Sequence, residues 1–220
     1  MEVKFKASNN VARIEITGII GGWDIWAEQI RSNIKQMVAE GATTAHLYIH
    51  SEGGDVFEAE EIVNVLRGAF STLKGEAGAL VASAASRIAL ACSSFAMPAN
   101  ALMMIHRPMM GVYGNVKKID AQMVALRAID ENYKTLYLSK TTDEKRFEEQ
   151  WDAGQDIWLS AEQARALGFA TKVIERTDVG DADLAAIAAC GYKGDLKKYE
   201  RVKEPTPVPL NEMFGFQNKM

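Results

Sequence analysis

Cysteine and clustered positive charge are scarce in this chain of 220 residues. The two cysteines, Cys92 and Cys190, are too few for a disulfide framework and do not have the spacing of a metal site, so we expect no bound metal. Lysine and arginine total 25 against 29 aspartates and glutamates, the net charge is -4, and no basic block occurs. Because nucleic acids and anionic membranes bind clustered positive charge, neither is an expected partner.

Long hydrophobic runs are also missing. The longest apolar stretch, residues 78–92, is interrupted by Ser83, Ser86 and Arg87, and it is shorter than the roughly 20 residues that a membrane helix needs. The first six residues lack the apolar core of a signal peptide. We therefore expect a cytoplasmic protein.

Proline is concentrated near the end of the chain. Pro205, Pro207 and Pro209 forbid regular strand pairing in a segment that is otherwise polar. We expect a short alanine-rich helix at 183–189 followed by a flexible tail. The sequence therefore predicts one folded domain over residues 1–177 and a C-terminal extension over 178–220.

Strand and helix patterns alternate along the first half of the chain. Period-2 or short apolar runs predict strands, and apolar residues at helical spacing predict helices between them. The expected strands are 11–18, 45–50, 76–81, 95–97 and 101–105, and the expected helices are 25–38, 59–70 and one beginning at about residue 84. This alternation predicts an α/β fold with a mainly parallel sheet and helices on its faces.

The second half of the chain begins with a long amphipathic pattern over residues 115–139. Its apolar stripe favours core packing over a cofactor site, and a helix of this length also suits subunit contact. A short helix at 143–151, a strand at 157–159, a helix with a capping-type start at Ser160 and a last strand at 170–174 are expected to follow.

Ser83 marks the start of the helix that follows the third strand. The free N–H groups and the dipole of a helix N-terminus favour developing negative charge, which suits a nucleophilic serine. A lone serine at this place is more often only an N-cap. Ser86 is a rival nucleophile, but it lies about one turn inside the helix, where its hydroxyl is expected to bond back to a carbonyl.

Two further positions fit acyl transfer, which needs a base near the serine and an acid that orients the base. His106 follows a strand, and Asp156 lies on a loop before a short apolar stretch. The pair Gly53-Gly54 also follows a strand, where exposed N–H groups meet the needs of an oxyanion hole. Taken singly, each signal is weak, because a buried histidine is the more frequent explanation for His106 and the glycine pair can be an ordinary turn.

Taken in order, four motifs resemble the signatures of the Clp protease proteolytic subunit over residues 11–175. They are Gly53-Gly54 after Ile49-His50-Ser51, Val81-Ala82-Ser83-Ala84-Ala85, Met104-Ile105-His106-Arg107-Pro108, and Asp156-Ile157-Trp158-Leu159-Ser160-Ala161-Glu162. The short interval between Ser83 and His106 is most similar to the phage and prophage branch of ClpP-like head maturation proteases.

The resemblance implies a ClpP/crotonase-type fold with a protruding long helix and the activity of a serine endopeptidase. Ser83 would be the nucleophile, His106 the general base and Asp156 the residue that orients the histidine. The N–H groups of Gly53 and Ala84 would form the oxyanion hole. No metal or bound cofactor is implied.

The resemblance also implies partners. We expect a homo-oligomeric ring, a heptamer or a double ring, that cleaves a protein or peptide substrate such as a phage capsid or scaffold protein and contacts capsid or portal proteins. An ATPase partner is not expected, because the first strand begins soon after Met1. The alternatives are an ATP-dependent general Clp-type subunit, a crotonase-type acyl-CoA enzyme without a triad, and a catalytically silent ring subunit.

Overall fold

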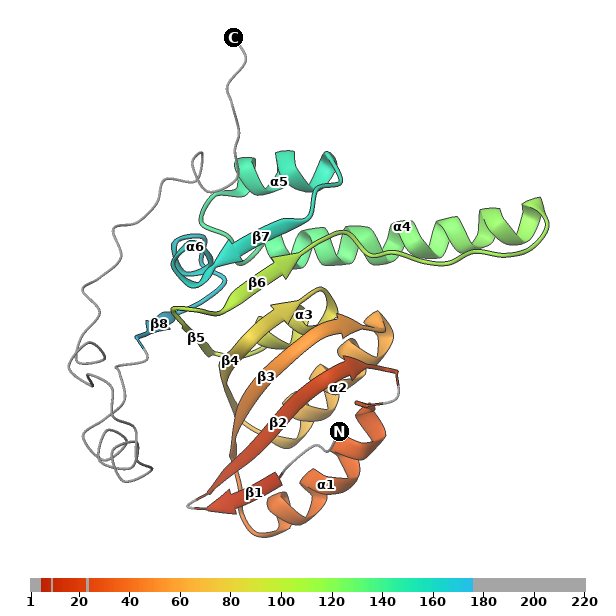
Figure 1. The fold of residues 1–220 in the computed structure, drawn as a ribbon. Helices are drawn as coiled ribbons and strands as arrows, with labels where there is room; N and C mark the ends of the chain where they lie inside the picture. Colours follow the sequence, from red (N-terminus) through yellow and green to blue (C-terminus); the bar gives the residue numbers. More distant parts are fainter. Residues whose placement is uncertain (1–4, 9, 23, 176–220) are drawn as a thin grey trace, which may run out of the picture. The chain divides into compact units, whose positions relative to one another are not determined.

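The computed structural model describes residues 5–8, 10–22 and 24–175 (Figure 1). The expected extension over 178–220 therefore lies outside the described residues, together with its short helix, its prolines and Cys190. None of the described helices is long and apolar enough to cross a membrane.

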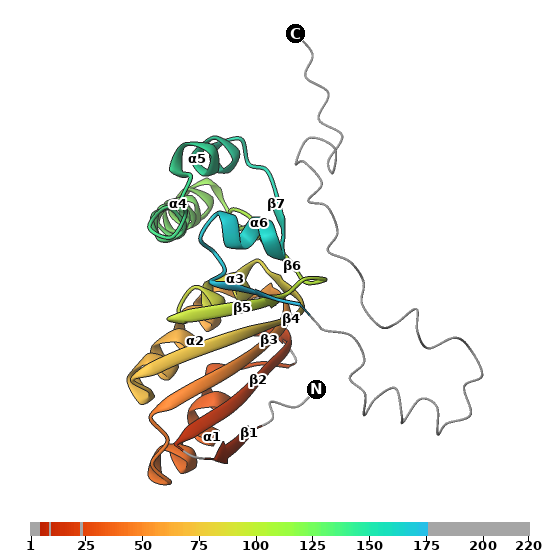
Figure 2. The same ribbon diagram turned by 90° about the vertical axis from the view of Figure 1, so that its left-hand side faces the viewer.

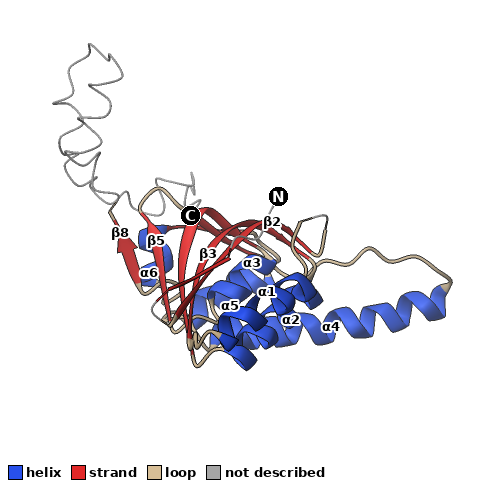
Figure 3. Ribbon diagram, turned by 90° about the horizontal axis from the view of Figure 1, so that it is seen from below, coloured by secondary structure: helices blue, strands red, loops and turns tan. Residues whose placement is uncertain are grey.

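Three parallel strands form the centre of the sheet: β2 (Val11–Ile20), β3 (Thr44–Gly54) and β4 (Thr72–Ala82). The connecting helices, α1 (Ala27–Ala39) and α2 (Val56–Ala69), lie on one face of the sheet (Figures 2 and 3). This arrangement confirms the predicted α/β fold with a mostly parallel sheet.

The strands after β4 bring distant parts of the chain to one edge of the sheet. β4 pairs in parallel with β5 (Ser94–Pro98) along its first half and with β6 (Leu102–Ile105) along its last residues. β6 in turn pairs antiparallel with β7 (Ile157–Ser160), and β5 pairs in parallel with β8 (Lys172–Ile174). The end of β6 therefore lies beside the end of β4.

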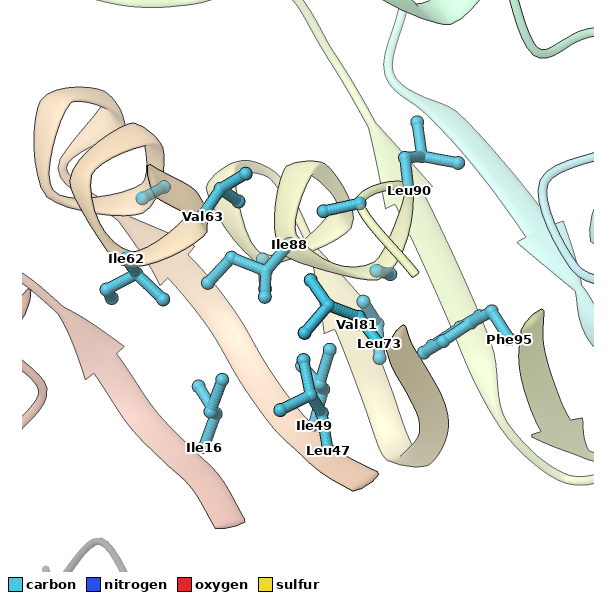
Figure 4. Close-up of a cluster of buried hydrophobic side chains, with 14 of the residues drawn as sticks. Ile16, Leu47, Ile49, Ile62, Val63, Leu73, Val81, Ile88, Leu90 and Phe95 are labelled. Carbon is cyan, nitrogen blue, oxygen red and sulfur yellow. The ribbon is translucent and has the colours of Figure 1, made fainter. Parts of the chain in front are cut away.

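Alternating strand residues build the core between the sheet and its helices. Ile16, Leu47 and Ile49 on the strands are fully buried, as are Ile62 on α2 and Ile88 on the following helix (Figure 4). Burying an aliphatic side chain of this size contributes about 1.5–3 kcal/mol relative to leaving it exposed. The core therefore fixes the position of the strand ends that carry polar residues.

A long helix, α4 (Val116–Leu138), projects from this core (Figure 1). Its bounds match the predicted segment, because the Asn115 side chain accepts a hydrogen bond from the Lys118 N–H and caps the first turn. The expectation of core packing holds only near its C-terminal end, where Tyr133 and Tyr137 are its buried residues. In its first half, Val116, Met123 and Val124 are exposed within the described chain, whereas Ile119 and Leu126 are half-buried.

Two shorter helices surround the end of α4. They are α5 (Glu144–Asp152) and α6 (Ala161–Ala166). The predicted capping start of α6 is confirmed, because the Ser160 side chain accepts from the Gln163 N–H while the Gln163 side chain accepts from the Ser160 N–H.

One strand was not predicted, and others differ in length from the prediction. The strand β1 (Phe5–Ser8) pairs antiparallel with β2 and was not predicted. β3 continues through the glycine pair, where only a turn was expected, and it shifts register beside β4. The helix after Ser83, α3 (Ala84–Ala89), has six residues and ends before Cys92, which belongs to the apolar stretch.

Candidate active site

Ser83 forms a sharp turn between β4 and α3. Its φ of 53° and ψ of -128° are unusual for a residue with a side chain, and such a conformation costs on the order of 1–3 kcal/mol. The Ser83 N–H donates to the Met104 carbonyl at 2.9 Å, which ties the turn to β6. The side chain makes no cap hydrogen bond to α3, so the N-cap alternative does not hold and the hydroxyl is available for another partner.

That partner is His106, the residue that follows β6. The parallel pairing of Ala82 with Met104 sets the two strand ends side by side. Ser83 Oγ lies 2.7 Å from His106 Nε2, within the hydrogen-bond reach that a nucleophile and its base require. The geometry is suited to removal of the hydroxyl proton by the imidazole.

Asp156 lies on the other side of the imidazole. The antiparallel pairing of Ile105 with Ile157 places the residues His106 and Asp156 next to each other at the ends of β6 and β7. Asp156 Oδ1 is 3.7 Å from His106 Nδ1, which is within ion-pair range but longer than a hydrogen bond. The Asp156 side chain is 60% exposed, so water screens this contact more than it would a buried one.

The oxyanion-hole role of Gly53 stays a prediction, and the structure places this residue in the turn beside Ser83 and Ala84. The Gly53 N–H donates to Ser51 Oγ at 3.0 Å, and Ser51 Oγ donates to the Gly18 carbonyl at 2.6 Å. The Gly53 N–H is therefore already used within the turn. Gly53 still has a steric role, because an added Cβ would lie 2.7 Å from Ser83 Cβ and its φ of 100° favours glycine.

Gly54, the next residue, lies at the site itself. It lines a small pocket together with other residues of the site; these are Val56, Ser83, Ala84, His106, Pro108, Met109, Tyr133 and Tyr137. The Asp55 N–H, one residue further on, donates to the Ile20 carbonyl of β2 at 2.8 Å and ties this turn to the neighbouring strand. A larger groove between α1 and α2 contains no serine or histidine.

Ser86, the rival nucleophile, is fully buried and already bonded. Its Oγ lies 2.6 Å from the Ser83 carbonyl oxygen and 2.7 Å from the Tyr137 hydroxyl. The expectation that its hydroxyl bonds back to a carbonyl is confirmed. Ser86 has no path to a substrate, and Ser83 is the nucleophile candidate that the geometry favours.

Two contacts of α4 with the site were not predicted. Tyr137 was assigned to the apolar stripe, and its sequence pattern carries no sign that its hydroxyl bonds Ser86. Arg107, directly after His106, forms a two-point ion pair with Asp130 of α4.

Among the residues the structure describes, no group of three His, Cys, Asp or Glu side chains is arranged to hold a metal ion.

Comparison with known proteins agrees with this architecture. The sequence matches the Clp protease family over residues 16–177. Among solved structures, a mutant of ClpP1 from Listeria monocytogenes is similar to the chain in fold, with a TM-score of 0.64 and 23% identity over 74% of this chain and 91% of that one. The family match covers well over half of the sequence, and the chain therefore belongs to the Clp protease family.

Proposed function

We propose that the chain is a serine endopeptidase in which Ser83 is the nucleophile and His106 the general base. The observation that carries this proposal is the 2.7 Å separation between Ser83 Oγ and His106 Nε2 at the edge of the sheet. Membership of the Clp protease family supports the same reaction class. The pocket around Ser83 gives a substrate carbonyl access to the hydroxyl.

In the first step, Ser83 Oγ attacks the scissile carbonyl carbon while His106 Nε2 takes the hydroxyl proton. The carbonyl electron pair moves onto oxygen, and the Ala84 N–H at the start of α3 stabilises this oxyanion. The C–N bond then breaks, His106 gives its proton to the leaving amine, and an acyl-enzyme remains. Water, activated by His106, hydrolyses the acyl-enzyme and regenerates Ser83.

Asp156 has a positioning role in this mechanism. For Nε2 to accept the Ser83 proton, the neutral imidazole must carry its own proton on Nδ1, the nitrogen that faces the Asp156 carboxylate at 3.7 Å. The carboxylate favours this tautomer and stabilises the imidazolium that forms during attack.

The first experiment is treatment of the purified chain with a fluorophosphonate probe, followed by mapping of the labelled peptide. Labelling at Ser83 that is lost in Ser83→Ala is the expected result. The matched control is Ser93→Ala, which removes a hydroxyl that bonds the Leu73 carbonyl at the other end of β4, and it should be labelled normally. Labelling at any other serine, or none, would contradict the proposal.

The same proposal extends to assembly and substrate. Val116 and Val124 are 74% and 68% exposed on the projecting half of α4, which suits contact between the subunits of a ring or double ring.

The short Ser83–His106 interval supports a substrate among phage capsid or scaffold proteins. The test is incubation of the chain with immature phage heads, without ATP. Cleavage only of unfolded protein, and only with a ring ATPase and ATP, would instead favour a general Clp-type subunit.

A further inference from the structure

Two hydroxyl groups connect α4 to the peptide bond that follows Ser83. A carbonyl oxygen can only accept, so the Ser86 hydroxyl donates its single proton to the Ser83 carbonyl at 2.6 Å. Ser86 Oγ must then accept the hydrogen bond that joins it to Tyr137 at 2.7 Å. The direction of the chain is therefore fixed, from the Tyr137 hydroxyl through the Ser86 hydroxyl to the Ser83 carbonyl.

The Ser83 carbonyl belongs to the same peptide group as the Ala84 N–H. A peptide group is planar and trans, so its C=O and N–H point in opposite directions, and orienting one orients the other. The Ser83 carbonyl also accepts from the Ser86 N–H at 2.9 Å, which gives it two donors. Hydrogen bonds in series polarise one another, so a carbonyl that accepts them makes its own N–H a stronger donor.

We propose that Ser86 and Tyr137 are positioning residues that orient and polarise the Ala84 N–H toward the oxyanion. The inference rests on the proposed function, in which this N–H binds the developing charge. Ser86 and Tyr137 are 0% and 1% exposed, so neither hydroxyl is placed to touch the substrate. Both act through the Ser83–Ala84 peptide, and Tyr137 makes the long helix part of the catalytic apparatus.

The surroundings of Tyr137 show that its hydroxyl is not needed for packing. Its ring lies among other aromatic rings, with centroids 5.8 Å away for Phe147, 5.7 Å for Trp151 and 6.2 Å for Phe169. A phenylalanine would fill the same space. Burial raises the pKa of Tyr137 to about 12, so the hydroxyl stays protonated and able to donate.

The test uses Tyr137→Phe, Ser86→Ala and the double variant, with Ser93→Ala as the control that removes a carbonyl-bonded hydroxyl elsewhere. Steady-state kinetics with a peptide substrate should show kcat lower by about tenfold in Tyr137→Phe and by more in Ser86→Ala, with KM within about twofold. A peptide aldehyde forms an adduct with Ser83 that carries the oxyanion. Its inhibition constant should increase by the same factor by which kcat/KM decreases. The control should keep wild-type values.

Stability measurements separate positioning from packing. Ser86→Ala leaves the buried Tyr137 hydroxyl without its acceptor and should lower Tm, whereas the double variant removes both hydroxyls and should regain much of that loss. We expect kcat to stay low in the double variant. Recovery of kcat together with Tm would overturn the inference, as would wild-type kcat in Tyr137→Phe.

Failure of the inference is distinguishable from failure of the proposed function. A wild-type chain that labels at Ser83 and turns over substrate, with variants that do the same at an equal rate, would overturn only the role of the two hydroxyls. A wild-type chain that is not labelled at Ser83 would overturn the proposed function and this inference with it.

Discussion

Arg107 Nε donates to Asp130 Oδ1 at 3.0 Å, and a second guanidinium nitrogen of Arg107 reaches the other carboxylate oxygen. The pair joins the residue directly after His106 to the middle of α4, and the carboxylate raises the pKa of Arg107. The same helix contacts Ser86 through Tyr137. Both halves of the Ser83–His106 pair are therefore attached to α4.

Loss of this ion pair should lower activity more than stability. In Arg107→Ala or Asp130→Asn, the loop after β6 loses its attachment, and we expect the rate of fluorophosphonate labelling at Ser83 to fall by about tenfold. The free energy of unfolding should change by less than about 1 kcal/mol, because the pair is partly exposed. Parallel labelling and denaturant titrations measure both effects. A normal labelling rate would show that the pair does not hold His106 in place.

Replacement of Asp156 by asparagine should favour the wrong imidazole tautomer while the fold survives. A buried triad aspartate contributes about four orders of magnitude to kcat. Asp156 is exposed and 3.7 Å from Nδ1, so we expect a smaller loss, on the order of a hundredfold. The measurement is kcat for peptide hydrolysis, with circular dichroism as the folding control. A loss under about threefold would mean that another group orients His106.

A charge on the projecting half of α4 should disrupt assembly. Val124 is 68% exposed within the single chain, and a glutamate there would be tolerated by a monomer but not by an apolar subunit contact. We expect Val124→Glu to sediment as a smaller species than the wild type. The matched control is Thr135→Glu, at an exposed position near the anchored end of the same helix. If the wild type itself sediments as a monomer at micromolar concentration, the proposed role of α4 in assembly is wrong.

Cys92 should resist alkylation in the folded protein. Burial raises the pKa of the Cys92 thiol from 9.0 to about 12, so very little reactive thiolate exists at pH 8.5. Peptide mapping after iodoacetamide treatment should find Cys92 unmodified until the chain is unfolded. Because the unfolded thiol ionises above pH 9 and the folded one does not, its contribution to stability should decrease as the pH rises beyond 9.

The order of elements was predictable because strand and helix periods are local. The proximity of Ser83 to His106 also followed from the expectation that parallel strand ends open at one edge, and the structure places their atoms 2.7 Å apart. Their catalytic roles stay predictions. The oxyanion-hole role of Gly53 also stays a prediction. The hydrogen bond from the Gly53 N–H to Ser51 was not predicted, because it depends on the local turn and leaves no trace in a motif.

Helix α4 shows a second limit of sequence patterns. An apolar stripe reports that side chains avoid water, but it does not say which surface covers them. Among the described residues, Tyr137 is buried by its own chain, whereas Val116 and Val124 are exposed. The hydrogen bond between Tyr137 and Ser86 was equally hidden, because it joins residues 51 positions apart through tertiary packing alone.

Under the proposed function, the positive-φ backbone of Ser83 sets stability against catalysis at a single position. Glycine adopts this conformation freely, so Ser83→Gly should be more stable than the native chain by about 1 kcal/mol, whereas Ser83→Ala keeps the strain. If Ser83 is the proposed nucleophile, selection for proteolysis must act continuously to retain a serine here. In a lineage where the protein survived only as a ring component, that pressure would disappear, and drift toward glycine would leave a chain that folds better than its active ancestor.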